Sequence, residues 1–400
     1  MKYDVVIVGA GIIGLSTAMQ LLKSSPRIKV LVLEKEKTFS SHQTGRNSGV
    51  IHSGLYYKPN SLKAINCIQG RKDLIKFCEN ENINFEICGK LVVAKSNEDL
   101  HQIKKLYERG ILNGLEGLKI LSKNEIKDKE PYCSASSGLF VPQTGIINYL
   151  EVSKKFVEKI QLFGGEIKYK TKVLKILEKN NEIEVITENK SFLASTLVTC
   201  AGLNSDRLAK MTEENLQIRI TPFKGEYFLL KPKARNLVKN LIYPVPNLNF
   251  PFLGVHFTRM IDGSIECGPN AVFSFAREGY KKTSFNLKDS FESLTWPGLF
   301  FLTRKYWKEG ISEFYRSLFK EAFVYELQKL VPSIKSDDIV PGNPGIRAQA
   351  CSLKGDLIDD FYYIKSENII HLCNAPSPAA TASLAIGKNI VSIISKKLNF

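Results

Sequence analysis

The stretch YDVVIVGAGIIG, residues 3–14, sets the architecture expected of this chain. Residues 3–8 form an apolar, β-branched run with a single charge, Asp4, inside it, which is typical of a strand buried on both faces of a sheet. Gly9, Gly11 and Gly14 follow in the order G-x-G-x-x-G, and an apolar helix is expected from residue 12 to about residue 22. Together these features predict a strand–turn–helix unit that binds a dinucleotide.

A second strand and an acidic residue complete this unit. A strand is expected at residues 28–33, which are apolar apart from Lys29, and Glu34 stands 20 positions after Gly14. In such a unit Gly9 permits the tight turn, Gly11 lets a pyrophosphate approach the helix N-terminus, and Gly14 lets the helix pack closely on its strand. Glu34 is expected to accept hydrogen bonds from the 2′-hydroxyl of an unphosphorylated ribose. The expected contacts at this end of the ligand are Gly9, Ala10, Gly11, Ile12, Gly14, Glu34 and Lys35.

Composition limits the class of protein. The 400 residues suffice for two or three domains, and 44% hydrophobic with 24% charged residues is typical of a soluble globular chain. No leader-like segment is recognised, so a cytoplasmic location is expected. The eight cysteines lack the short spacings of zinc, iron–sulfur or redox sites. They are therefore expected to be reduced core residues, and no metal is expected.

The net charge of +16 raises the question of an anionic partner. Lysines are interleaved with Glu and Asp along the expected helices, and no nucleic-acid-binding module is recognised. The pattern favours a solvated lysine-rich surface, with attraction to an anionic membrane as the main alternative.

The remaining pattern predicts an α/β fold with a Rossmann-type domain that is discontinuous in sequence. This dinucleotide-binding domain is expected to comprise residues 1–85, 145–215 and 340–400. A second domain with an antiparallel sheet is expected to bind the substrate, in residues 86–144 and 216–339, with a helical insertion near 285–331. Helices are expected at residues 61–81, 98–109 and 148–163, and a turn at Asn180-Asn181. Strands are expected at residues 90–94, 138–142, 172–177, 182–187, 196–199, 225–230, 241–245, 252–257, 264–267, 345–351, 361–365 and 369–373.

The glycine fingerprint is compatible with NAD or FAD, and the segments after Glu34 separate the two. A long irregular loop, residues 36–60, follows where an NAD-binding domain usually continues with regular strand–helix units. The strand ending at Ala201-Gly202 and the last helix, which follows a Pro-Ser-Pro turn, return to the same sheet. This arrangement favours FAD, because a helix N-terminus stabilises charge on a reduced flavin. Further expected contacts are Thr44, Asn47, Ser48, Gly49, Val173, Ala201, Gly202, Pro378, Ala379 and Thr381.

Four motifs carry a resemblance to a known family. They lie at residues 44–57, 222–227, 268–280 and 374–381. In these motifs the chain resembles the FAD-dependent oxidoreductases of the D-amino-acid oxidase/glycine oxidase superfamily, and more closely the bacterial L-2-hydroxyglutarate oxidases/dehydrogenases. Two positions depart from the family pattern: Arg46 stands where His is more usual, and Ser53 where another small residue is common.

The resemblance implies oxidation of a 2-hydroxy dicarboxylate to a 2-oxo acid, with electrons passed to quinone or oxygen. This chemistry needs a base for the hydroxyl proton and a cation for the α-carboxylate. It also needs a further cation or hydroxyl group for the distal carboxylate. The same fold acting on an amine or amino acid is the nearest alternative, and a nucleotide-binding protein without turnover is a more distant one.

Few residues meet these requirements. His52 and His256 are the candidate bases, whereas His101 is expected on the surface, His371 in the core and His42 in a polar loop. Arg347 is the candidate clamp for the α-carboxylate, because a guanidinium matches a carboxylate bidentately. The candidates for the distal carboxylate are Tyr57, Lys224 and Arg259.

The stretch at residues 296–308 is rich in aromatic and basic residues. One interpretation makes it ordinary core and rim of the substrate domain. The other places its aromatic and basic side chains on a membrane surface, peripherally on the cytoplasmic face of the inner membrane.

Overall fold

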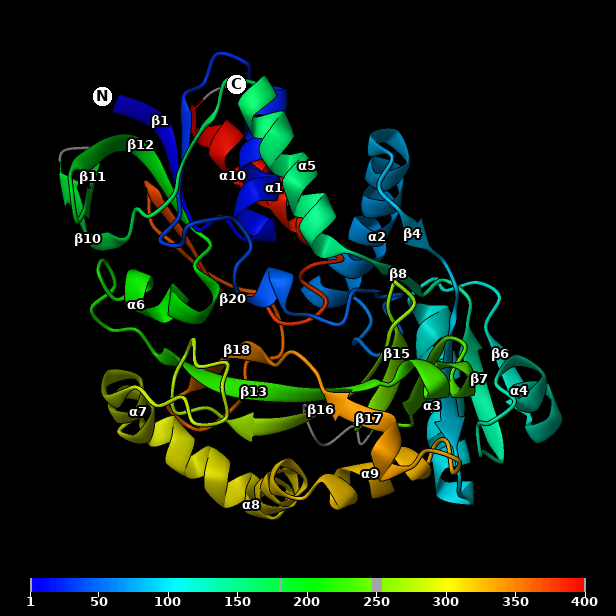
Figure 1. The fold of residues 1–400 in the computed structure, drawn as a ribbon. Helices are drawn as coiled ribbons and strands as arrows, with labels where there is room; N and C mark the ends of the chain where they lie inside the picture. Colours follow the sequence, from blue (N-terminus) through cyan, green and yellow to red (C-terminus); the bar gives the residue numbers. More distant parts are fainter. Residues whose placement is uncertain (1, 180–181, 247–253, 399–400) are drawn as a thin grey trace.

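The computed structural model describes residues 2–179, 182–246 and 254–398. Among these, two large sheets face each other across a layer of loops (Figure 1). The first sheet has eight strands in the order β10-β11-β12-β1-β2-β9, with β20 beside β12 and β19 beside β20. Its strands are β1 Lys2–Val8, β2 Val30–Leu33, β9 Glu166–Lys168, β10 Val173–Lys179, β11 Glu182–Thr187, β12 Ser191–Thr199, β19 Tyr362–Lys365 and β20 Ile369–Asn374.

The centre of this sheet is parallel and buried on both faces. β1 pairs in parallel with β2 and β12, and β12 with β20. Val5, Val6 and Ile7 have no exposed surface, as expected for a strand covered on both sides. Three helices pack together on one face: α1 Ile12–Ser24, α5 Tyr149–Leu162 and α10 Ser383–Leu398. The sheet therefore joins segments far apart in the sequence, which confirms the expected Rossmann-type, discontinuous architecture.

The second sheet has nine strands in the order β17-β13-β16-β15-β14-β5-β7-β6, and β18 pairs with β13 along the same edge as β17, opposite β16. It is antiparallel except where β14 runs parallel to β5. Its strands are β5 Lys90–Ala94, β6 Lys119–Ser122, β7 Ser137–Val141, β13 Ile218–Leu230, β14 Leu241–Pro244, β15 His256–Arg259, β16 Ile265–Phe273, β17 Ile339–Pro341 and β18 Gly345–Ser352.

The position of β18 corrects the domain boundary expected at residue 340. β18 pairs along its whole length with β13, for example Arg347 with Phe223, and so belongs to the substrate sheet. The alternation of apolar residues identifies a strand, but it does not say which free edge that strand will join. The chain returns to the first sheet only at β19.

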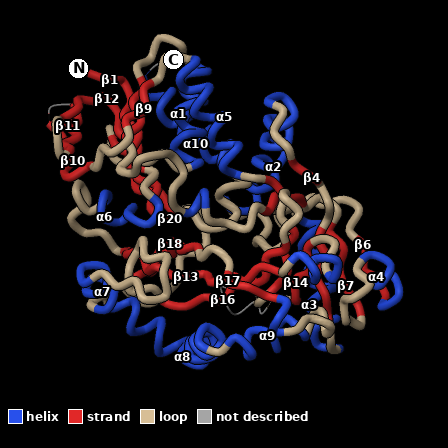
Figure 2. Tube along the Cα trace, in the orientation of Figure 1, coloured by secondary structure: helices blue, strands red, loops and turns tan. Residues whose placement is uncertain are grey.

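Helices cover the far face of the second sheet, as the tube drawing in Figure 2 shows. They are α7 Leu287–Leu294, α8 Pro297–Leu318 and α9 Lys320–Gln328. Trp296 anchors the start of α8, because its ring N–H donates to the Cys351 carbonyl of β18 at 3.1 Å. Leu299 and Leu302 are buried beside it, whereas Phe300 and Trp307 are more than half exposed. Residues 296–308 thus combine a core-facing side with an apolar outer side.

The remaining elements connect the two sheets. They are α2 Leu62–Glu81, α3 Asn97–Leu112, α4 Lys123–Lys129, α6 Ser205–Ala209, the 3₁₀ turns η1 Gln43–Gly45, η2 Gly202–Asn204, η3 Pro232–Leu237 and η4 Ser336–Asp338, and a small sheet of β3 Val50–Ile51, β4 Phe85–Glu86 and β8 Gly145–Ile147. The turn expected at Asn180-Asn181 lies outside the described residues, as do Phe252 and Leu253 of an expected strand.

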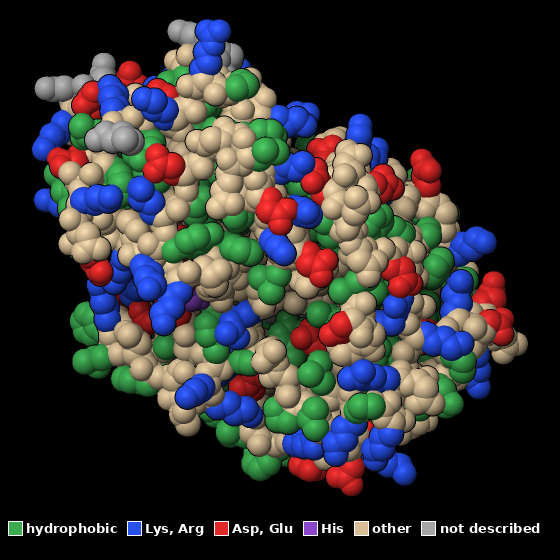
Figure 3. Space-filling model, turned by 45° about the horizontal axis from the view of Figure 1, so that its top comes forward, with side chains coloured by type: hydrophobic (Ala, Val, Ile, Leu, Met, Phe, Trp, Pro, Cys, Tyr) green, Lys and Arg blue, Asp and Glu red, His purple; other side chains and the backbone are tan. Residues whose placement is uncertain are grey.

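Charge is spread over the surface. Figure 3 shows Lys and Arg side chains intermingled with Asp and Glu over the visible face. In the described part of the chain, no helix is both long and apolar enough to cross a membrane.

Candidate active site

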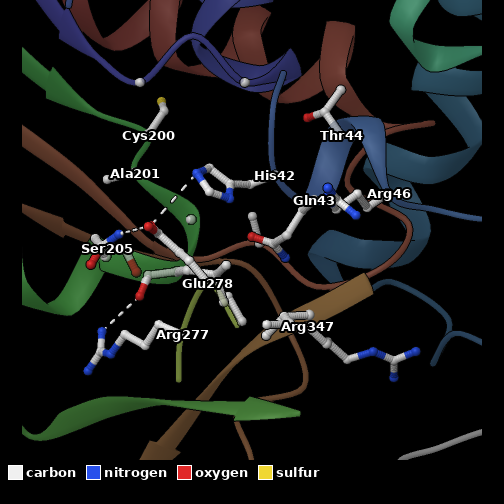
Figure 4. A pocket seen from close by; sticks show the side chains of 18 of the residues that line it. His42, Gln43, Thr44, Arg46, Cys200, Ala201, Ser205, Arg277, Glu278 and Arg347 are labelled. Carbon is white, nitrogen blue, oxygen red and sulfur yellow. Dashed lines mark hydrogen bonds and ion pairs between the residues drawn. The ribbon is translucent and has the colours of Figure 1, made fainter. Parts of the chain in front are cut away.

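A cavity of about 1060 Å³ lies between the two sheets, and Figure 4 looks into it. Cys200 and Ala201 stand at the end of β12, and Arg347 on β18 lies toward the opposite side of the view. Most of the expected dinucleotide contacts line this cavity, namely Gly9, Gly11, Ile12, Glu34, Lys35, Thr44, Asn47, Ser48, Val173, Ala201, Gly202, Pro378 and Ala379.

The glycines of the fingerprint differ in what surrounds them. A Cβ on Gly14 would lie 2.0 Å from the Gly9 carbonyl oxygen, so only glycine lets α1 pack this closely on β1. Gly9 has a φ of +111°, and a Cβ there would lie 2.5 Å from the carbonyl oxygen of Cys200. A Cβ on Gly11 would meet nothing closer than the Thr44 hydroxyl at 3.6 Å. Space is therefore open in front of Gly11, where a pyrophosphate is expected.

Side chains fix the loops around this turn. The Glu34 carboxylate accepts from the backbone N–H of Ala10 at 2.7 Å and of Glu36 at 2.9 Å, which holds it at the end of β2. The Thr44 hydroxyl accepts from the N–H of Ile12 at 3.1 Å in the first turn of α1. These contacts place an acid and a helix N-terminus in one wall, as an adenosine diphosphate requires.

Four expected contacts do not line the cavity. They pack behind the residues that line it or hold the neighbouring loops in place. Ala10 and Gly14 lie behind the turn, and the N–H of Gly49 donates to the Asn47 side chain at 2.8 Å. Thr381 is fully buried; its hydroxyl bonds to Tyr149 at 2.8 Å and accepts from the His52 N–H at 3.1 Å. Thr381 thus ties the loop before α10 to the loop that carries His52.

The cavity fits FAD. Its volume lies at the upper end for small-molecule sites, as a ligand longer than a mononucleotide needs. The glycine turn and Glu34 line one end of the cavity. The loop before α10, with Ser377, Pro378 and Ala379, also lines the cavity. The open space at Gly11 supplies the close backbone approach to a pyrophosphate.

His52 lines the cavity, and its Nε2 lies 3.2 Å from the Ser377 hydroxyl. Burial lowers the pKa of His52 to about 3, assisted by the nearby cations Lys90, Lys63 and Arg347 and by His256. The imidazole is therefore neutral at pH 7 and able to accept a proton.

His256 is buried and held rigidly. Its Nδ1 lies 2.7 Å from the Gly254 carbonyl, which only accepts, so Nδ1 carries the proton and Nε2 has the free lone pair. The ring stacks on Tyr243 with centroids 3.9 Å apart. Burial lowers its pKa to about 4, so His256 is also neutral, but it does not line the cavity as His52 does.

Arg347 lines the same cavity as His52, beside Tyr227 of β13. Burial lowers the pKa of the guanidinium, and the neighbouring Tyr227 and Tyr57 act in the opposite direction. An arginine remains charged in proteins, so the site contains a fixed cation near a neutral base. Tyr57 is placed close by, because its hydroxyl interacts with Ser377, which also contacts His52.

Two of the candidates for the distal carboxylate face elsewhere, which corrects the expectation. Lys224 lies on the opposite face of β13 from Tyr227 and is 3.6 Å from the Glu226 carboxylate. Arg259 is paired with Glu86 at 2.5 Å. Successive side chains along a strand point to opposite faces of the sheet. A cation one position earlier or later along the same strand therefore points away from the cavity instead of toward it.

The other histidines have structural partners. His371 is buried between the hydroxyls of Thr199 and Thr212, each 2.8 Å from one ring nitrogen. His101 is exposed on α3. His42 lines the cavity and bonds to the Tyr280 hydroxyl at 2.6 Å, beside an ion pair of Lys35 with Glu278.

Several residues of the site escaped the sequence interpretation. Ser377 and Tyr227 line the cavity without having been expected as site residues. Arg46, noted above only as a departure from the family pattern, also lines it, and its guanidinium lies 3.8 Å from the centroid of the Tyr280 ring. Lys90 is 2% exposed in the middle of the large sheet. Its signal was a lysine at the head of the apolar run Leu91-Val92-Val93-Ala94, an unusual place for a charge.

Known proteins resemble the chain along its whole length. The family described as FAD dependent oxidoreductase matches residues 4–393. The L-2-hydroxyglutarate dehydrogenase of Indibacter alkaliphilus is 50% identical over 98% of both chains. The enzyme of the same name from Escherichia coli K12 is 44% identical over 98% of this chain and 92% of its own.

Solved structures agree on the fold. The L-α-glycerophosphate oxidase of Mycoplasma pneumoniae, solved with FAD bound, superposes with a TM-score of 0.81 at 24% identity, over 99% of this chain and 95% of that one. Glycine oxidase from Geobacillus kaustophilus gives 0.76 at 17% identity, over 99% and 95%. With the glycine turn, Glu34 and the two-sheet cavity, these matches establish that the chain belongs to the FAD-dependent oxidoreductase family and that its cofactor is FAD.

Proposed function

We propose that this FAD-dependent oxidoreductase converts L-2-hydroxyglutarate to 2-oxoglutarate. The relatives of 41–50% identity that bear the name L-2-hydroxyglutarate dehydrogenase support this substrate. The observation that carries the proposal is local. A neutral histidine, His52, and a half-buried cation, Arg347, line the same cavity as the FAD-binding turn.

The residues divide the chemistry between them. FAD, when bound, supplies the acceptor for the hydride that leaves C2 of the substrate. Arg347 holds the α-carboxylate in a fixed orientation through two parallel hydrogen bonds. The neutral imidazole of His52 accepts the proton of the C2 hydroxyl as the hydride leaves C2. The C2–O bond becomes a carbonyl, and 2-oxoglutarate leaves with both carboxylates unchanged.

Anaerobic reduction of the purified holoenzyme tests the substrate. L-2-hydroxyglutarate is expected to bleach the flavin absorbance within seconds, whereas the D-enantiomer, glycine, sarcosine and D-alanine are expected to leave it unchanged. Bleaching by an amino acid alone would assign the chain to an amine substrate of the same fold. A holoenzyme that no hydroxy acid or amino acid reduces would overturn the proposal.

We further propose that the outer side of α7 and α8 contacts an anionic membrane, where a quinone accepts the electrons. Trp307, Ile311, Phe314 and Leu318 follow helical spacing after a kink at Tyr306 in α8. These four residues, and Phe300 before the kink, are each more than half exposed. Exposed cations surround them: Lys281, Lys282, Lys288, Arg304, Lys305 and Lys308. Aromatic side chains beside lysines suit the interface of an anionic bilayer.

Vesicle co-sedimentation checks this contact. The protein is expected to bind phosphatidylglycerol-containing vesicles and to bind phosphatidylcholine vesicles weakly, with added salt releasing it. Replacing Phe300 and Trp307 by Ser is expected to weaken partitioning at least about tenfold, because two large side chains no longer enter the interface.

The matched control replaces Leu112 and Leu162 by Ser, since both are equally exposed but lie on α3 and α5. Equal losses in the two double variants would contradict a membrane face at α7 and α8. Faster reoxidation of the reduced flavin by air than by a soluble quinone would contradict quinone as the acceptor.

A further inference from the structure

Lys90 is a buried lysine that the mechanism above does not use, and burial lowers the pKa of its ammonium to about 7. It opens β5 and is 2% exposed, which is rare for a lysine without an acidic partner. Its Nζ lies 4.2 Å from the centroid of the Tyr56 ring and 4.9 Å from that of Tyr243. Aromatic faces attract a cation, but they do not replace the hydrogen bonds that an ammonium makes in water.

No hydrogen bond or ion pair of the Lys90 ammonium is found within residues 2–179, 182–246 and 254–398. The neighbouring Tyr56 hydroxyl is also buried and without a partner there. Two buried donors with no acceptor carry a free-energy cost that a bound anion would remove. By contrast, the nearby Lys63 is paired with Asp359 at 2.9 Å.

Strand register places Lys90 on the side of the large sheet that faces the cavity, although Lys90, like His256, is not among the residues that line the cavity. The opposite side is marked by the directly paired residues Leu91, Ile242, Phe257, Cys267 and Phe228 on five neighbouring strands. Since side chains alternate along each strand, Lys90, Tyr243, His256 and Tyr227 share the other side. Arg347 lies on the same side, because it pairs directly with Phe223 of β13. Phe223 points to the same side as Tyr227, since the two are an even number of residues apart on that strand.

This face therefore carries a cation at each end and histidine between them. The strand order from Arg347 to Lys90 is β18-β13-β16-β15-β14-β5, with His256 on β15. Both cations help to lower the pKa of His52, and Lys90 does so more strongly than Arg347. Both cations also help to lower the pKa of His256. A substrate with C2 at His52 thus lies between two positive charges.

We propose that Lys90 binds the distal carboxylate of the dicarboxylate substrate, opposite the α-carboxylate held by Arg347. This assignment rests on the proposed function and gives Lys90 the role that Lys224 and Arg259 do not fill. The Tyr56 hydroxyl supplies a second donor to the same carboxylate. Lys90 thereby makes the site bind a five-carbon dicarboxylate more tightly than a monocarboxylate of equal length.

Binding of unreactive ligands to the oxidised holoenzyme tests the assignment. Glutarate has both carboxylates and no hydroxyl, and pentanoate has one carboxylate on the same carbon chain. Titrations followed by the flavin absorbance are expected to show tighter binding of glutarate to the wild type. Lys90→Met is expected to lose about 10- to 100-fold in glutarate affinity and to leave pentanoate affinity unchanged.

Lys224→Met is the matched control. It removes a buried lysine of the same sheet from the opposite face and is expected to keep the preference for glutarate. Thermal unfolding without ligand adds a readout that does not depend on binding. Lys90→Met is expected to unfold at the same or a higher temperature, because it removes a buried amine that lacks a hydrogen-bond acceptor and whose charged form is disfavoured by burial.

The outcomes separate the two proposals. Retained glutarate preference in Lys90→Met, or a lower unfolding temperature than the wild type, overturns the role of Lys90. If L-2-hydroxyglutarate fails to reduce the wild-type flavin although glutarate binding depends on Lys90, the proposed reaction fails and the dicarboxylate site stands.

Discussion

Replacing His52 by Gln is expected to slow anaerobic reduction of the flavin by L-2-hydroxyglutarate about 10²- to 10⁴-fold, the usual contribution of a general base. Gln preserves the size of the side chain and a hydrogen bond with Ser377, but it cannot accept a proton. The backbone N–H of His52, which donates to Thr381, is unaffected. Stopped-flow absorbance of the holoenzyme measures the loss directly.

The matched variant is His256→Gln. His256 does not line the cavity, and its Nδ1 is engaged by Gly254. Its replacement is therefore expected to slow reduction less than about tenfold. Both variants must contain as much FAD as the wild type for the comparison to hold. A larger loss in His256→Gln than in His52→Gln would transfer the base to His256.

The pH dependence of the wild type provides a second check. The pKa of His52 lies well below its ordinary value, so the basic form is fully present from about pH 5 upward. Flavin reduction is then expected to depend little on the state of His52 between pH 5 and 8. A rise in rate with an apparent pKa near 6.5 would contradict a buried, neutral His52.

The same shifts have a consequence for stability. Burial lowers the pKa of His256 and of His371 to about 4, so the native state resists protonation at these positions. Their contribution to stability is complete above about pH 6.5 and is lost as the pH falls toward 4. Rate measurements at acid pH therefore need a parallel record of unfolding.

Replacing Gly11 by Val is expected to yield a folded protein that does not hold FAD. Gly11 has φ −78° and ψ 171°, values that any residue adopts, and its Cβ direction is open. A valine side chain there fills the space in which the pyrophosphate must approach the backbone. The purified variant is expected to be colourless, to unfold cooperatively, and to remain colourless after incubation with excess FAD.

Gly14→Val is the contrasting variant. Its Cβ would lie 2.0 Å from a backbone oxygen that cannot move without parting α1 from β1. This variant is expected to lose more than about 4 kcal/mol of stability and to be recovered mainly as aggregate. A yellow, stable Gly11→Val protein would show that the dinucleotide does not pass in front of this residue.

Local patterns in the sequence predicted much of this molecule. The glycine spacing, the apolar run at residues 3–8 and Glu34 identify a dinucleotide-binding turn, because they act over a few residues of chain. The strand expected at residues 90–94 is present as β5, and the helix at residues 61–81 begins one residue later, after the Ser61 cap. These elements follow from periodicity and capping, which are properties of neighbouring residues.

The selection of cations in the site could not be read in this way. Lys224, Arg259, Arg347 and Lys90 are all positive residues within or next to strands. Their roles differ because pairing register sends each side chain to one face of a sheet. The residues of a β-strand do not specify which sheet edge it joins: β18 pairs with β13, and only the chain after it, from β19, returns to the first sheet.

The sequence alone therefore identified the turn that binds the cofactor, but it did not identify the set of residues proposed to bind the substrate. A dinucleotide is bound largely by backbone groups of one continuous turn, so its signature is local. The proposed substrate contacts come from strands and loops separated by hundreds of residues, among them His52, Lys90 and Arg347. Only tertiary packing brings such side chains together, buries them, and thereby sets which is neutral and which is charged.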